Sequence, residues 1–248
     1  MMKLALIADI HGNLTALDAV LDQLKSEAPD KIVCLGDTAI FGPQPQQVLD
    51  RLYELKCSMV MGNTDAWALK PKPHPVTDEE SGYFNDIELW GAKQLDFAYP
   101  VFIRNFWATV EVDLENGMKL LCYHGSPLSY DDPIEPDTPD DVLDGYFAGT
   151  TAQILAGGHT HVQFMRQYGD RTLINPGSVG LPFQARPDGS GDSNPAWAEY
   201  ALLTWDGPEV HIDLRRVPYD LEALRAAVHA SGMPHAEWWL KDWEAVSG

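Results

Sequence analysis

Residues 4–11, Leu-Ala-Leu-Ile-Ala-Asp-Ile-His, change character within one step of the chain. The apolar run 4–8 is typical of a strand that is buried on both faces. Asp9 and His11 follow it at once and bring side chains that bind protons and metal ions. Apolar residues then recur at helical spacing, at Leu14, Leu17, Val20, Leu21 and Leu24. This stretch predicts a strand, a loop with a carboxylate and an imidazole side chain, and a helix. Strand, loop and helix are the repeating unit of a parallel α/β sheet.

The same pattern occurs twice more. Strands are predicted at 32–35 and 59–61, with a helix at 46–55 between them. Right-handed crossovers would place the three strands parallel in one sheet. Ligands of such sheets bind at the carboxyl ends of the strands. Asp9, Asp37 and Asn63 each fall at such an end, so we expect them to lie close together.

The rest of the chain predicts further strands and helices and one long loop. A helix is expected at 79–95 and another at 219–230. Gly, Pro, Asp and Ser dominate 182–195, which predicts a loop, and the tryptophan-rich tail 235–243 is expected to dock on the body of the protein. Strands are expected at 109–114 and 119–123, joined by a tight turn at 115–117, at 154–156, at 162–167 and 172–174 as a hairpin, and at 200–204 and 210–214.

Length and composition predict one large α/β domain spanning 1–248. Hydrophobic residues make up 45% of the chain and charged residues 22%, which is ordinary for a globular protein. No apolar run approaches the ~20 residues of a membrane span, and the N-terminus lacks a signal-peptide pattern, so we expect a cytoplasmic protein without membrane contact. Segments 75–106 and 126–148 are candidates for a partial cap over the site.

The formal net charge of −20 argues against long DNA or RNA as a partner, because polyanions are repelled. Part of this charge lies in segment 128–144, which contains seven acidic residues and no Lys or Arg. Such a run is usually a solvated loop, although it could instead screen substrates at a cleft or bind a further cation. Cys34, Cys57 and Cys122 lack metal-ligand spacing and are expected to be reduced thiols.

Seven donor residues carry the predicted chemistry. A single Asp or His at a strand end is more often a cap or a structural group, so the prediction depends on the whole set. Carboxylate, amide and imidazole donors together suit Mn, Fe, Ni, Co or Zn, whereas Ca and Mg prefer oxygen alone. We therefore predict two divalent metal ions at the sheet edge, held by Asp9, His11, Asp37, Asn63, His124, His159 and His161.

Glycines accompany several of these donors. Gly36, Gly62 and Gly158 precede a donor and Gly125 follows one, and glycine allows a positive φ or a close backbone approach. Asn13 follows the first loop. It either caps the next helix or contacts a ligand or phosphate.

The order of these motifs resembles the signature of the calcineurin-like metallophosphoesterase superfamily. The matching elements are Asp9-x-His11, Gly36-Asp37, Gly62-Asn63, His124-Gly125 and Gly158-His159-Thr160-His161, and Asn175-Pro176-Gly177-Ser178 resembles small bacterial phosphodiesterase-like members. The resemblance implies a four-layer αββα sandwich with two mixed β-sheets. It places the dinuclear site at the loops that follow the strands.

The resemblance also implies roles for individual residues. Asp9, His11 and His161 would hold one metal ion, Asn63, His124 and His159 the other, and Asp37 would bridge them, with manganese favoured. A hydroxide shared by the ions would attack phosphorus in line. The residues expected to take part in catalysis are Asp37, Asn63, Thr64, Asp65 and His124.

One position departs from the superfamily pattern. Thr64 stands where many members have a histidine that helps the leaving group depart, and a hydroxyl is no proton donor near neutral pH. This favours phosphodiesters or phosphoanhydrides, such as nucleotide-derived polyphosphates, as the small phosphorylated substrate. The alternatives are a phosphomonoesterase or protein phosphatase, and a non-catalytic scaffold with the same fold. No pattern in the chain indicates an oligomeric state.

Overall fold

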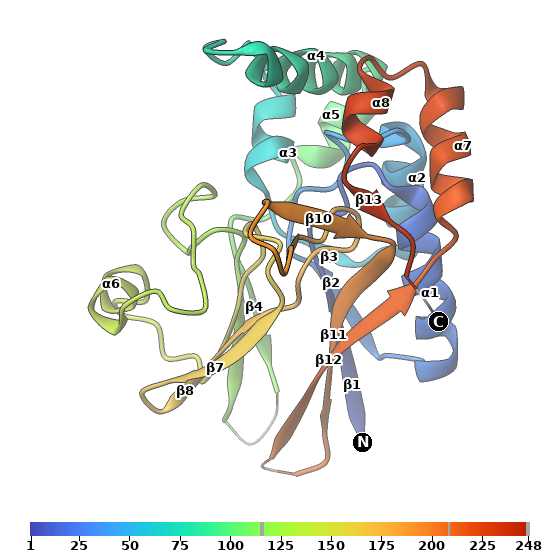
Figure 1. The fold of residues 1–248 in the computed structure, drawn as a ribbon. Coiled ribbons are helices and arrows are strands. Elements are labelled where there is room, and N and C mark those ends of the chain that lie inside the picture. Colours follow the sequence, from blue (N-terminus) through green and yellow to red (C-terminus); the bar gives the residue numbers. More distant parts are fainter. Residues whose placement is uncertain (115–116, 208, 247–248) are drawn as a thin grey trace.

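Two five-stranded mixed sheets form the centre of the computed structural model, which describes residues 1–114, 117–207 and 209–246 (Figure 1). The first sheet has the strand order β12-β11-β1-β2-β3. Its strands β1, β2 and β3 are parallel, as predicted, and β11 and β12 extend it antiparallel beside β1. These strands span Met2–Ile7 (β1), Lys31–Cys34 (β2), Ser58–Met59 (β3), Trp197–Trp205 (β11) and Val210–Pro218 (β12).

The second sheet has the order β4-β5-β6-β8-β7, with β5, β6 and β8 parallel and the two edge strands antiparallel. The hairpin predicted around residue 169 is confirmed by the pairing of β7 with β8. The tight turn predicted at 115–117 falls on residues 115 and 116, which lie outside the described residues. The strands span Val110–Asp113 (β4), Lys119–Cys122 (β5), Ile154–Ala156 (β6), Phe164–Tyr168 (β7) and Arg171–Asn175 (β8).

The two sheets pack face to face through buried aliphatic side chains. Leu4, Leu6 and Val33 from the first sheet belong to the same core cluster as Leu120 and Ile154 from the second. Helices α1 (Leu14–Glu27) and α2 (Pro45–Leu55) cover the other face of the first sheet through a separate core.

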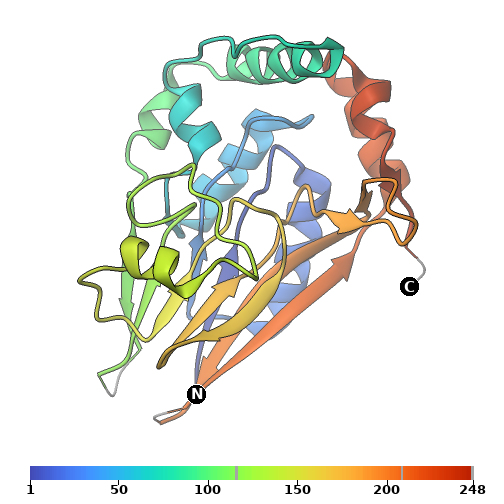
Figure 2. The same ribbon diagram turned by 60° about the vertical axis from the view of Figure 1, so that its left-hand side comes forward.

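The fourth layer is thin. Segment 126–152 covers the outer face of the second sheet with one short helix, α6 (Asp140–Tyr146), and Leu143 and Phe147 pack there against Leu155 and Leu173 (Figure 2). The expected four-layer αββα arrangement is therefore present. The acidic run 128–144 was expected to be a solvated loop. Its last part instead belongs to α6, which is too short to show an apolar periodicity in the sequence.

Helices α3, α4 and α8 stand beyond the carboxyl ends of the parallel strands, at the top of Figure 1. The predicted helices 79–95 and 219–230 correspond to α4 and α7, whereas α3 and α5 were not predicted because six residues are too few for a recognisable apolar face. The helices span Asn63–Ala68 (α3), Glu79–Gln94 (α4), Ala98–Ile103 (α5), Leu221–Ser231 (α7) and Ala236–Leu240 (α8).

The expected loop 182–195 is partly wrong, because it contains two strands of a small third sheet. Strand β10 (Asp192–Pro195) pairs with β9 (Gln184–Ala185) and with β13 (Trp243–Glu244) from the tail. The pairing partner lies about fifty residues away in the sequence, so local composition could not reveal it. The tail docks on the body as expected, and Trp239 and Trp243 are only 5% and 4% exposed.

All three cysteines are free thiols, and Cys34 and Cys122 are buried in the sheets. None of the helices in the described residues is long and apolar enough to cross a membrane.

Asn13 is the N-cap of α1, so the first of its two expected roles, helix cap or ligand contact, is the one that the structure shows. Its Oδ1 accepts a hydrogen bond from the Ala16 backbone N–H at 3.1 Å. Its Nδ2 donates to the Gly180 carbonyl at 3.0 Å and to the Tyr219 hydroxyl at 3.4 Å. The side chain is fully buried, so Asn13 ties the start of α1 to the loop after β8.

We expect Asn13→Ala to lower the free energy of unfolding by about 1–2 kcal/mol, because it removes a helix cap and leaves the Gly180 carbonyl without this donor. Asn13→Ser retains a capping oxygen and should cost less. Urea unfolding of the three proteins tests this order. A serine variant as unstable as the alanine variant would show that capping is not the main contribution.

Candidate metal centre

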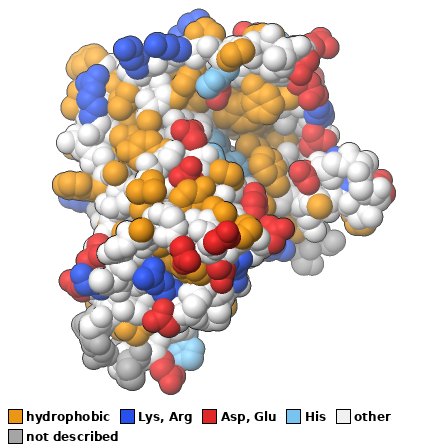
Figure 3. Space-filling view, turned by 90° about the vertical axis from the view of Figure 1, so that its left-hand side faces the viewer, with side chains coloured by type: hydrophobic (Ala, Val, Ile, Leu, Met, Phe, Trp, Pro, Cys, Tyr) orange, Lys and Arg blue, Asp and Glu red, His pale blue; other side chains and the backbone are white. Residues whose placement is uncertain are grey.

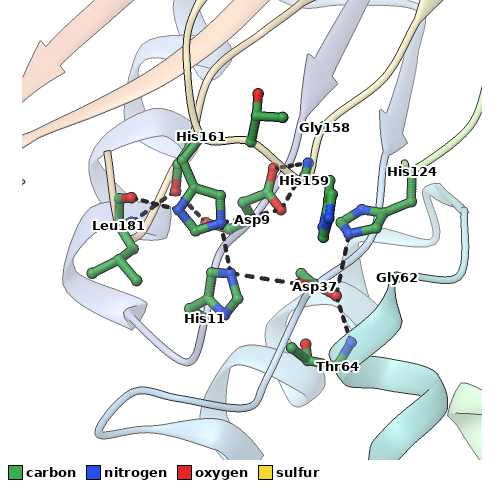
Figure 4. A network of polar contacts seen from close by, with 12 residues as sticks. Asp9, His11, Asp37, Gly62, Thr64, His124, Gly158, His159, His161 and Leu181 are labelled. Atoms are coloured by element: carbon green, nitrogen blue, oxygen red, sulfur yellow. Dashed lines mark hydrogen bonds and ion pairs between the residues drawn. The ribbon is translucent and has the colours of Figure 1, made fainter. Parts of the chain in front are cut away.

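All seven predicted donor residues come together beyond the carboxyl ends of the parallel strands. Figure 4 labels all of them except Asn63. Parallel strands end at the same edge of a sheet, so loops far apart in sequence meet there. Backbone hydrogen bonds join these loops. The Asp9 N–H donates to the Gly36 carbonyl at 3.0 Å, and the Gly158 N–H donates to the His124 carbonyl at 2.9 Å.

One group of ligand atoms comes from Asp9, His11 and His161. The Nε2 atoms of His11 and His161 lie 3.0 Å apart, and His161 Nε2 lies 3.6 Å from Asp9 Oδ1. The His161 and His11 side chains are 6% and 5% exposed and Asp9 is fully buried. These donors surround a point at the end of β1.

The second group comes from Asp37, His124 and His159, with Asn63 beside them. Asn63 Oδ1 lies 2.9 Å from His124 Nε2 and 3.1 Å from His159 Nδ1. Asp37 faces both groups. Its Oδ1 is 3.5 Å from His124 Nε2, and its Oδ2 is 3.6 Å from His11 Nε2. Asp37 therefore has the position that a bridging ligand requires.

Backbone carbonyls fix the orientation of three histidine rings. The Nδ1 atoms of His11, His124 and His161 donate to the carbonyls of residues 40, 35 and 181 at 2.9, 2.8 and 2.7 Å. Each Nε2 then carries a free lone pair, as second-shell hydrogen bonds arrange for metal-binding histidines. Two such lone pairs facing each other at 3.0 Å repel unless they share a cation or proton. The donor set thus fits a metal ion.

Five of the seven donor residues have a left-handed backbone. The φ angles are 53° at Asp9, 47° at His11, 53° at Asp37, 72° at His159 and 59° at His161. Non-glycine residues in this region are uncommon and cost on the order of 1–3 kcal/mol each, and they concentrate at functional sites. The fold holds these loops in a strained form that aims their side chains inward.

The glycines beside the donors are needed for two different reasons. Gly36 has a φ of +102°, which a side chain would disfavour. Gly62 has an ordinary φ, but a Cβ there would lie 2.1 Å from Asp37 Oδ1. Gly62 therefore leaves room for the Asp37 carboxylate.

Asp65 holds the Asp37 loop in place. Its fully buried carboxylate accepts hydrogen bonds from the backbone N–H groups of Asp37, Thr38 and Gly62 at 2.8, 3.0 and 3.1 Å. It also accepts one from the Thr38 hydroxyl at 2.6 Å. Asp65 was expected among the catalytic residues. These contacts make it a positioning residue that acts through Asp37.

Thr64 lies directly beside Asp37, at the start of α3. Its backbone N–H donates to Asp37 Oδ1 at 2.9 Å. Its Oγ1 is buried and has no hydrogen-bond partner among the described residues. The hydroxyl is therefore unpartnered within this part of the chain, and residue 64 brings no imidazole to the site.

The site binds protons when it holds no metal. Burial raises the pKa of Asp9 to about 8, against the effect of the nearby His124. Burial also opposes ionisation of Asp37, but His124 and His11 outweigh it and lower the pKa of Asp37. Burial lowers the pKa of His124, yet the carboxylates of Asp37 and Asp9 raise it to about 9. A cation entering the second group would displace the proton of His124.

Two contributions were missed by the sequence analysis. Ser178 donates through Oγ to the Asp9 carbonyl at 2.7 Å, and Asn175 Nδ2 donates to the Gly158 carbonyl at 2.9 Å. Segment 175–178 was noted only for its resemblance to small bacterial family members. Its hydrogen bonds stabilise the loops that carry Asp9 and His159. The ring of Phe183 stacks on His161, with centroids 4.9 Å apart and planes 15° apart. No sequence pattern pointed to Phe183.

A mixed Asp, Asn and His donor set at strand ends, between two mixed sheets, defines a metal-dependent phosphoesterase. The chain belongs to the calcineurin-like phosphoesterase superfamily, whose domain model matches residues 2–191. This family membership makes the protein a hydrolase that needs divalent metal ions.

Individual relatives agree with this membership. The uncharacterized protein MJ0912 of Methanocaldococcus jannaschii is 29% identical, over 95% of this chain and 94% of that protein. The phosphodiesterase YfcE of Escherichia coli strain K12 is 26% identical, over 75% of this chain and 84% of its own. A crystal structure of a metallophosphoesterase from Sphaerobacter thermophilus shares the fold, with a TM-score of 0.72, 22% identity and 97% of each chain covered.

Proposed function

We propose that this protein is a two-metal phosphoesterase that hydrolyses a phosphodiester or phosphoanhydride, with a nucleotide-derived compound as its small substrate. Asp9, His11 and His161 would hold one divalent ion and Asn63, His124 and His159 the other, with manganese favoured. The observation that carries the proposal is the placement of Asp37. Its two oxygens face separate donor groups, at 3.6 Å from His11 and 3.5 Å from His124.

When bound, the two ions would supply Lewis-acid activation of a water nucleophile and charge neutralisation of the phosphate oxygens. The protein donors leave the centre positive. Asp9 and Asp37 offset only half the charge of two divalent cations, because the other donors are neutral imidazoles and an amide. An anionic phosphate is thereby attracted to one point of a chain whose net charge is −20.

The preference for diesters or anhydrides is supported by Thr64. A threonine hydroxyl can form hydrogen bonds, but it cannot protonate a poor leaving group near neutral pH. The similarity to a phosphodiesterase of Escherichia coli supports the same preference. A monoesterase or protein phosphatase is the alternative within the enzymes.

In this proposal, residues 1–248 form one domain, and segments 75–106 and 126–148 form a partial cap over the metal centre. Ile87 on α4 supports a cap, because it packs in one core cluster with Ile40 and Phe41. The Ile40 carbonyl accepts the hydrogen bond of His11 Nδ1, so α4 packs against a loop of the metal centre. Long nucleic acids and membranes are not expected as partners, given the acidic charge.

Hydrolysis of bis-(p-nitrophenyl) phosphate in the presence of Mn²⁺ tests the proposed function. We expect turnover that His124→Ala abolishes and that the exposed control His211→Ala leaves unchanged. A panel of phosphomonoesters, cyclic nucleotides and dinucleoside polyphosphates then ranks substrates. If the protein hydrolysed none of these compounds and took up no metal, the result would instead favour a non-catalytic scaffold.

The role of position 64 leads to a separate prediction. Thr64→His should raise turnover of an alkyl phosphate diester by about tenfold or more, because an imidazolium can protonate the leaving oxygen. Turnover of a nitrophenyl ester should change little, since nitrophenolate leaves without a proton. Thr64→Gln is the matched control without a titratable proton. Equal effects on both substrates would contradict this account.

A further inference from the structure

A pocket with aromatic walls adjoins the candidate metal centre. Its volume is about 240 Å³, and it brings together segments that are far apart in the chain. Histidine side chains are recessed in a hollow between hydrophobic side chains in Figure 3. The apolar lining residues are Phe41, Phe84, Leu181, Phe183, Trp238 and Trp239.

The pocket shares a wall with the first donor group. Phe183 stacks on the ring of His161, with centroids 4.9 Å apart. Leu181 lines the pocket and also accepts the Nδ1–H hydrogen bond of His161 through its carbonyl at 2.7 Å. Phe41 follows Ile40, whose carbonyl holds His11 at 2.9 Å. A molecule held in the pocket would therefore extend from the metal centre.

The aromatic rings are held in place by one another. Phe41 and Phe84 stack with centroids 4.7 Å apart and planes 12° apart, and Phe84 meets Trp238 edge to face at 5.1 Å. Trp239 donates through Nε1 to the Phe41 carbonyl at 2.9 Å. Phe84 and Phe183 nevertheless remain 45% and 44% exposed. Two large aromatic rings that remain partly exposed at one pocket suit stacking of a flat ligand.

Polar groups stand at the rim of this aromatic pocket. Glu80 accepts from Trp238 Nε1 at 3.2 Å and from Lys241 Nζ at 2.7 Å. Asn194 and Asp242 also line the pocket. A ligand with flat faces and hydrogen-bonding edges matches this combination, whereas an acyl chain would leave the charged rim unused.

We infer that the aromatic pocket binds the nucleobase of a nucleotide-derived substrate, on the side of the phosphate that does not leave. The inference rests on the proposed function and adds the recognition element for its substrate. A volume of about 240 Å³ is below the range typical of sites for whole drug-sized ligands and fits one ring system.

Two diesters with the same leaving group test this assignment. Thymidine 5′-(p-nitrophenyl) phosphate carries a base and methyl p-nitrophenyl phosphate does not. With the Mn²⁺-loaded protein, we expect a KM about tenfold lower for the thymidine ester at similar kcat, because one base stacks in the pocket. Phe84→Ala should remove this difference, so that the two esters have the same KM.

Matched variants separate stacking from a general defect. Phe84→Tyr keeps an aromatic ring and should keep the preference for the thymidine ester. Phe97→Ala, at a side chain that is 88% exposed and outside the pocket, should behave as the wild type. An equal KM for the two esters in the wild type, or an unchanged preference in Phe84→Ala, would overturn the inference.

A binding measurement keeps the inference independent of catalysis. Adenosine has no phosphate to cleave, and its stacking beside Trp238 should quench tryptophan fluorescence of the metal-loaded protein. Phe84→Ala should weaken binding at least about fivefold. Such binding in a protein that hydrolyses neither ester would support the base site and contradict the phosphoesterase function. Hydrolysis without adenosine binding would contradict the base site alone.

Discussion

Replacing Asp37 with Asn is expected to lower Mn²⁺-dependent diester hydrolysis by about a thousandfold or more, since charge stabilisation at two-metal centres contributes several kcal/mol. The two carboxylate oxygens lie 3.6 Å from His11 Nε2 and 3.5 Å from His124 Nε2, so one side chain serves both donor groups. Asn retains the shape but loses the charge and one oxygen donor. Metal content, measured by mass spectrometry, should fall together with activity.

The control for this prediction is Asp213→Asn. Asp213 is an exposed aspartate that pairs with Arg215 at 2.7 Å, away from the metal centre. Its replacement should leave activity within about twofold, as is usual for a surface ion pair. If Asp37→Asn kept full metal content and a tenth or more of the activity, Asp37 would not bridge the two ions.

Asp65→Ala is expected to lower the free energy of unfolding by about 3–5 kcal/mol, because four buried donors lose their shared acceptor. Those donors are three backbone N–H groups and the Thr38 hydroxyl, at 2.6–3.1 Å from the Asp65 carboxylate. Urea unfolding in the presence of a chelator measures this cost without a contribution from bound metal. Activity should fall as well, because the loop that carries Asp37 loses its anchor.

Asp220→Ala provides the comparison. Asp220 caps α7 by accepting from the N–H groups of Glu222 and Ala223, but at an exposed position. Water can replace that acceptor, so the cost should be near 1 kcal/mol. A similar loss of stability in the two variants would mean that the buried hydrogen bonds of Asp65 contribute no more than an exposed helix cap does.

The central sheets and the donor residues could be predicted because their signals are local. The apolar run 4–8 and its repeats indicate buried strands, and a donor that follows such a strand must lie at its carboxyl end. Asp9, Asp37 and Asn63 were placed together by this argument alone. His124, His159 and His161 belong to the second sheet, and they joined the set through their donor chemistry and the family resemblance.

The errors occurred where long-range contacts overrule local composition. Segment 182–195 has the composition of a loop, yet it forms strands because β13 from the tail pairs with it. Helices α3 and α6 are too short for a periodic signal, and packing stabilises them. The catalytic role expected for Asp65 stays a prediction, and its four hydrogen bonds show that it positions the loop that carries Asp37.

The sequence by itself determined the α/β class, the family and the identity of the predicted donor residues. Apolar periodicity and the order of motifs are local properties that can be read without the tertiary structure. Only the tertiary structure decided that the two oxygens of Asp37 face different donor groups. It also decided that the donors adopt left-handed φ angles and that Phe183 stacks on His161. These features depend on loops from different strands pressing on one another, and no single stretch of sequence contains that contact.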